Sequence, residues 1–178
     1  MMNLTRKSSF VSRLRPVWVP VLAAALIMTG CDPENPDGGE EEITTVKVAL
    51  TAAGTTTTYT WKDGATPDKI SLSPNTTYTA AVTFLNENET PAEDITLEVK
   101  EEGDEHLVCY TVSGANLTIT RTDDDGTGKP IGLAAQWVTL AASTGSLILE
   151  LRHQPGVKDG SCTPGDTDVE VTFDVEVK

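Results

Sequence analysis

The sequence predicts an all-β fold for residues 43–178, with two antiparallel sheets packed as a β-sandwich of immunoglobulin-like architecture. Thr, Val, Ile and Tyr are frequent in this region, and such residues suit a pleated, half-buried surface. Apolar and polar residues alternate in several segments, which is the period of a strand with one buried face. Turn residues recur about every ten positions, a spacing typical of short strands. The Cys-Trp-Cys arrangement of antibody domains is absent, so "immunoglobulin-like" describes the architecture only.

The clearest predicted strand ends the chain, where apolar residues from Val169 to Val177 alternate with acidic or polar ones. One face of this strand should pack in a core while the other meets water. The same alternation occurs at 46–50, 78–84 and 147–151. Further strands are expected at 56–62, 68–73, 105–113, 116–121 and 133–142. Eight or nine short strands without a βαβ rhythm indicate two packed sheets.

One segment, near 91–103, breaks the β pattern and predicts a short helix. Thr90-Pro91-Ala92-Glu93 reads as a capping box with proline at the first helical position, and Gly103 is placed to end the helix. Ile95 and Val99 are four residues apart, on one helical face. Ile95, Leu97 and Val99 also alternate, so a strand is the competing interpretation.

The first 30 residues predict a lipoprotein signal peptide. Arg6, Lys7, Arg13 and Arg15 form a basic region, and the apolar run 17–28 is too short to cross a bilayer as a helix. Met28-Thr29-Gly30-Cys31 follows and resembles the lipobox of bacterial lipoproteins. The resemblance implies cleavage before Cys31, a diacylglyceryl group on its thiol and an acylated amino terminus. Three acyl chains would anchor the protein permanently to a membrane that it does not span.

Residues 31–42 comprise Cys31 and a predicted flexible tether. The stretch DPENPDGGEEE contains no apolar side chain, and its acidic groups repel one another. Acidic tracts directly after the lipidated cysteine resemble surface-export signals of some Gram-negative lipoproteins. We therefore expect attachment to the outer membrane, on its periplasmic face or at the cell surface.

The charge balance is strongly acidic. Removal of residues 1–30 takes away four basic residues and no acidic one, leaving nine Lys and Arg against 27 Asp and Glu, a formal charge of −18. Nucleic acids and anionic lipid surfaces both require clustered cations, so neither is an expected partner. The excess acid suits a soluble domain or one that attracts cations.

The two histidines of the chain suggest a divalent-metal site. His106 begins one predicted strand and His153 ends another, and alternation places both on the core-facing side. Antiparallel pairing of these strands, or their apposition across the sandwich, would bring both imidazoles to one rim. Glu102, Asp104 and Asp159 are the candidate carboxylate ligands. Zinc, or another divalent cation, is the expected ion; the alternative is that each histidine caps its strand by bonding to local backbone.

Cys109 and Cys162 are the two cysteines that follow the tether. An exported protein can form a disulfide between them. Alternation places Cys109 on the face opposite the large apolar residues of its strand. Two separate thiols are the favoured expectation.

Several segments prompt a family resemblance: Leu85-Asn86-Glu87, Thr90-Pro91-Ala92-Glu93-Asp94-Ile95, Asp104-Glu105-His106, Leu151-Arg152-His153-Gln154-Pro155 and Lys158-Asp159-Gly160. With the lipobox and the acidic tether, they resemble a family of small β-rich bacterial lipoproteins, some catalogued under a type 1 periplasmic-binding-fold label. That label denotes a two-lobed α/β fold about twice as long, unlike the β pattern here. The resemblance implies association with outer-membrane receptors.

No nucleophile is paired with a base in the sequence, so an enzyme is not expected. The leading functional hypothesis is an anchored, non-catalytic binding domain that captures a divalent metal or small ligand for an outer-membrane transporter. The alternative is a structural or adhesive surface module that binds a protein or glycan. Tyr59, Trp61 and Trp137 are interpreted as core or sheet-face residues rather than a sugar platform.

Overall fold

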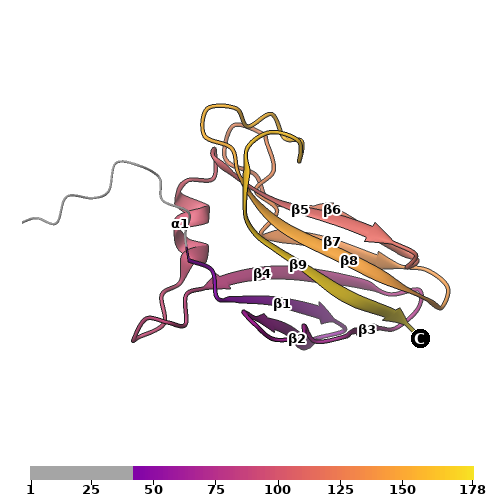
Figure 1. Cartoon of the computed structure of the whole chain (residues 1–178). Helices are drawn as coiled ribbons and strands as arrows, with labels where there is room; N and C mark the ends of the chain where they lie inside the picture. The colour runs from indigo at the N-terminus through magenta and orange to yellow at the C-terminus, as the bar shows by residue number, and fades with distance from the viewer. Residues whose placement is uncertain (1–41) are drawn as a thin grey trace, which may run out of the picture. The chain divides into compact units, whose positions relative to one another are not determined.

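The structure is a computed structural model that describes residues 42–178. The predicted signal peptide, the lipidation site Cys31 and all of the tether except Glu42 lie outside the described residues. Nine strands and one helix occur in the described part. Figure 1 shows how they are arranged. They are β1 (Thr45–Ala52), β2 (Thr55–Lys62), β3 (Ile70–Leu72), β4 (Thr77–Leu85), α1 (Ile95–Glu101), β5 (His106–Ser113), β6 (Leu117–Arg121), β7 (Ala134–Thr139), β8 (Ser143–His153) and β9 (Asp166–Val177).

The strands form two sheets, which confirms the predicted all-β sandwich. One sheet has five strands in the order β2-β1-β4-β7-β6, and the other has four in the order β3-β9-β8-β5. Every neighbouring pair is antiparallel except β3 and β9, which run parallel. Each strand predicted from alternation is present, with ends shifted by a few residues. The immunoglobulin-like description of the architecture stays a prediction.

The core lies between the sheets and is built by the alternation that the sequence shows. On β9 the five apolar residues from Val169 to Val177 are buried, and on β8 Leu147, Leu149 and Leu151 are wholly buried. Trp137 of β7 lies among them, with its ring edge-on to that of Tyr110 at a centroid distance of 6.1 Å. Full burial of each such side chain contributes about 1.5–3 kcal/mol to folding.

The short helix is confirmed, although α1 begins later than the capping box predicts. Asp94, and not Thr90, is its N-cap, and the Asp94 carboxylate accepts a hydrogen bond from the Thr96 amide. The residues before Asp94 do not join the helix, because Glu93 forms a β-bridge with Asn86. The competing strand is excluded, since Ile95 is 3% exposed whereas Leu97 is 61% exposed. Within the described range, no helix has the length and apolar character needed to cross a bilayer.

Three connections gather at one end of the sandwich, at the upper left of Figure 1: residues 102–105, 122–133 and 154–165. The buried side chain of Lys158 joins them. Its ammonium donates to the Gly103 carbonyl at 2.5 Å and lies 3.3 Å from the Asp125 carboxylate. Burial alone would raise the pKa of Asp125, but hydrogen bonds from Thr127, Lys129 and Lys158 outweigh it and keep the pKa below its usual range. Asp125 is therefore ionised, and its contact with Lys158 holds the loops together.

Candidate metal centre

The register of β5 and β8 brings the two histidines together. The strands are antiparallel and His106 lies directly opposite His153, so both side chains project from the same face. Their rings stack with centroids 4.8 Å apart and planes inclined by 6°. The prediction that both imidazoles reach one rim is confirmed, and strand pairing is the reason.

His106 is the buried member of the pair. Its Nδ1 lies 3.2 Å from the main-chain carbonyl oxygen of Glu102. A carbonyl oxygen can only accept, so this bond requires the proton on Nδ1 and leaves the lone pair on Nε2. Burial lowers the pKa of His106; the Glu102 carbonyl opposes this shift and the nearby His153 adds to it. The ring is therefore neutral near pH 7, which is the form that binds metals.

The end of α1 supplies the carboxylate. Glu102 is the C-cap residue, and its amide donates to the Glu98 carbonyl. The turn that follows returns the chain to β5, with the amides of Glu105 and His106 both donating to the Glu102 carbonyl. Glu102, His106 and His153 each offer a ligand atom, and these atoms lie within 4.8 Å of one another.

The stacked rings limit how the group can chelate. Ligand nitrogens on one zinc ion are about 3–4 Å apart, given bonds of about 2.0–2.1 Å. Each lone pair lies in its ring plane, so parallel rings direct their lone pairs along parallel planes. One ring must turn before both nitrogens face a common ion. His153 is the ring that can turn, because its side chain is 18% exposed while His106 is fully buried.

Asp104 and Asp159 are not members of this group in the described structure, which corrects the predicted ligand set. Asp159 instead accepts a hydrogen bond from the Ser161 amide at 2.8 Å. Hydrogen bonds from the Ser161 hydroxyl and amide lower the pKa of Asp159. Asp104 is exposed in the turn before β5. Glu105 is the acidic neighbour that the predicted set lacks, with its carboxylate 3.6 Å from Nε2 of His153. Its position directly before His106 was the only sequence signal for it.

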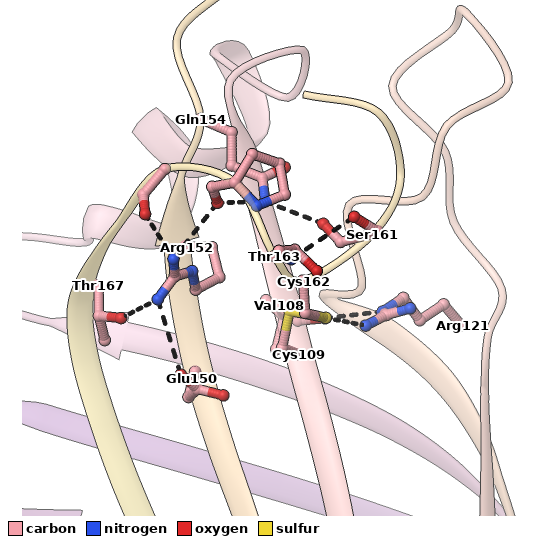
Figure 2. The surroundings of a disulfide bond; sticks show 12 residues. Val108, Cys109, Arg121, Glu150, Arg152, Gln154, Ser161, Cys162, Thr163 and Thr167 are labelled. Atoms are coloured by element: carbon pink, nitrogen blue, oxygen red, sulfur yellow. Dashed lines mark hydrogen bonds and ion pairs between the residues drawn. A yellow bond between two sulfur atoms is a disulfide. The ribbon is translucent and has the colours of Figure 1, made fainter. Parts of the chain in front are cut away.

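Cys109 and Cys162 form a disulfide, so the expectation of two separate thiols is wrong. Cys109 does lie on the outer face of β5, as alternation predicts. The loop 154–165 crosses that face, as Figure 2 shows, and leaves Cys109 only 1% exposed. The crossing brings the two Cα atoms to 6.0 Å, within the range that a disulfide spans.

Side chains near the histidines hold this loop in place (Figure 2). Gln154 donates from Nε2 to the carbonyls of Ser161 and Pro164, both at 2.9 Å. Arg152 donates to the carbonyls of Pro164 and Gly165. Gly165 has φ +81°, and a Cβ there would lie 2.0 Å from the His153 carbonyl. Only glycine permits such a close approach, which positions the loop against the end of β8.

The expected kinship with small β-rich bacterial lipoproteins stays a prediction. Neither the models of protein families, nor the curated proteins, nor the solved structures contain a match to this chain.

Proposed function

We propose that this chain is a lipid-anchored protein of the bacterial outer membrane whose β-sandwich binds a divalent cation through Glu102, His106 and His153. The observation that carries the proposal is the approach of three ligand-type side chains, two from paired strands and one from a helix end, to within 4.8 Å. Two imidazoles and a carboxylate are a ligand set that zinc accepts. The bond from Nδ1 of His106 to a backbone carbonyl is the outer contact typical of a metal-binding histidine.

The proposed role is capture and transfer, without a catalytic step. Three protein ligands leave a coordination position open, and the exposed Glu105 carboxylate lies beside His153. An ion held at such a rim can be passed on without unfolding of the domain. The lipid anchor would keep the site beside an outer-membrane transporter, which is the proposed recipient.

The anchor has its own support in the sequence and its own test. The basic region, the short apolar run and Met28-Thr29-Gly30-Cys31 agree with lipidation of Cys31. We expect the chain to partition into detergent when produced in a Gram-negative cell, and we expect Cys31→Ser to move it to the aqueous phase. Persistent detergent partitioning of Cys31→Ser would contradict the anchor and leave the metal site untouched.

Thermal unfolding of the full chain with and without zinc tests the metal site. Free zinc at about 100 times its Kd stabilises the folded state by about 2.7 kcal/mol. With an unfolding entropy of about 2.1 cal/mol/K per residue, this raises the Tm of a domain spanning residues 43–178 by about 9 °C. We expect His153→Ala, a change at a partly exposed side chain, to abolish the rise.

Glu101 and Glu102 provide a matched pair of variants, because both are exposed glutamates at the end of α1 and only Glu102 belongs to the group. Glu102→Gln should weaken zinc binding, whereas Glu101→Gln should leave the zinc-dependent Tm unchanged. The metal site would be refuted if saturating zinc did not change the Tm, or if zinc still raised the Tm of His153→Ala. Retention of a protein partner from an envelope extract, with no response to metal, would favour the adhesive alternative.

A further inference from the structure

A second candidate site lies at the end of the sandwich away from the histidines, where the five-stranded sheet overhangs its partner. The edge strand β2 spans eight residues, but the facing edge strand β3 has only three. The inward-facing residues of the first half of β2, Thr55 and Thr57, are exposed. A groove with a volume of about 380 Å³ lies there, in the size range of small-ligand sites.

Two tyrosines form fixed walls of this groove. Tyr59 of β2 donates its hydroxyl proton to the Ser71 carbonyl at 2.6 Å. Tyr78 of β4 accepts a hydrogen bond from the Ser73 amide at 2.8 Å. Both rings pack against the core and are only partly buried, so each keeps exposed surface that lines the groove. Their orientation is set before any ligand arrives, which lowers the entropic cost of binding.

Apart from Leu50, the remaining lining is small, uncharged and rich in hydroxyl groups. It includes Thr55 and Thr57 of β2, Ser73 and Thr76 before β4, Ala52 at the end of β1 and Ala53 of the β1–β2 turn. Among the described residues, no Asp, Glu, Lys or Arg lines the groove, although the whole chain carries a formal charge of −14. A groove without charged side chains suits a neutral polar ligand, because it offers no opposite charge to pair with an ionic one.

We propose that this groove binds a neutral oligosaccharide. Sugar rings carry apolar C–H faces that pack on aromatic rings, and their hydroxyls exchange hydrogen bonds with threonine and serine. Tyrosine suits this role because it offers a rigid apolar ring with a polar end. Tyr59 packs against the core, in agreement with the core or sheet-face role that the sequence indicates, and its exposed surface also lines the groove. This site shares no residue with the proposed metal centre.

Titration of the full chain with uncharged hexasaccharides tests the proposal. The probes are the hexamers of α-1,4-glucose, β-1,4-glucose, β-1,4-mannose and β-1,4-galactose, with a galacturonic acid hexamer as the charged counterpart. Binding is followed by isothermal titration and by NMR shifts of the tyrosine rings, with EDTA present to keep the metal centre empty. We expect at least one neutral hexamer to bind with a Kd below about 1 mM and to shift the signals of Tyr59 and Tyr78.

Thr57 and Thr58 are a matched pair of exposed threonines on β2. Thr57 lines the groove, whereas Thr58 pairs with Ala49 and lies on the opposite face. Thr57→Glu should raise the Kd at least tenfold, and Thr58→Glu should leave it within twofold; about 1.4 kcal/mol corresponds to tenfold. Failure of all four neutral hexamers to bind would overturn the proposal. Equal effects of the two variants, or preferential binding of the galacturonic acid hexamer, would also overturn it.

Discussion

Removal of the Cys109–Cys162 disulfide should cost this domain much of its stability. The bond closes a loop of 53 residues. The chain-entropy relation assigns a crosslink over such a loop about 4 kcal/mol of stabilisation at 25 °C, because the uncrosslinked unfolded chain gains that freedom. An unfolding entropy of about 0.29 kcal/mol/K for a domain of this size converts the loss into a fall in Tm of about 14 °C.

The assay is thermal unfolding of the full chain carrying Cys31→Ser, so that Cys31 contributes no thiol. The test variant adds Cys109→Ala and Cys162→Ser, with alanine chosen at the buried position and serine at the exposed one. The parent chain treated with a reductant provides a second measurement in which no buried atom is lost. Both samples should unfold about 14 °C below the oxidised parent.

Two results would refute this reasoning. Titration of two free thiols in the denatured, unreduced parent would show that the bond does not form. A fall in Tm of less than about 3 °C in both samples would show that the 53-residue loop is already restricted in the unfolded chain.

The remaining predictions concern the helix and the buried histidine. Ile95→Ala should lower the free energy of unfolding by about 2–5 kcal/mol, while Leu97→Ala should change it by less than about 0.5 kcal/mol; urea unfolding measures both, and equal losses would contradict the helical face. Burial lowers the pKa of His106 in the folded chain. When the pH falls below about 6.5, the ordinary pKa of histidine, the unfolded chain therefore binds a proton that the folded chain does not. Stability is therefore complete above about pH 6.5 and is lost as the pH falls toward the folded pKa. Between pH 7 and 5.5 the Tm of the parent should fall more steeply than that of His106→Gln, and parallel slopes would refute the shift.

The strands and the faces of the sheets were predictable because alternation is a local property. Leu147, Leu149 and Leu151 recur at every second position, and the structure buries all three completely. The same rule placed His106 and His153 on inner faces, one at the start of a strand and one at the end. Antiparallel pairing then sufficed to bring them together.

The disulfide was not predictable by that rule, since it depends on a loop that crosses a sheet face. A signal was nevertheless present. Leu107 and Cys109 both lie on the face of β5 that alternation assigns to solvent, and both are buried. A continuous apolar run such as Leu107-Val108-Cys109 is typical of a strand covered on both faces. Which of the candidate carboxylates joins the histidines was not predictable either, because turn hydrogen bonds and not proximity in sequence decide where Asp159 points.

The two ends of the sandwich differ in electrostatics, and this difference supports the different ligands that we propose for them. At the histidine end, Glu102, Asp104 and Glu105 follow one another within four residues of His106, so the local potential raises the concentration of cations there. The two imidazoles then favour transition metals over calcium or magnesium, which prefer oxygen ligands. At the groove, carboxylates are absent from the described lining, and the same excess of acid elsewhere on the protein repels anionic sugars. A higher salt concentration should therefore slow metal capture, because salt screens the attraction between the acidic groups and the cation. Binding of a neutral oligosaccharide should stay unchanged, because it does not depend on attraction between charges.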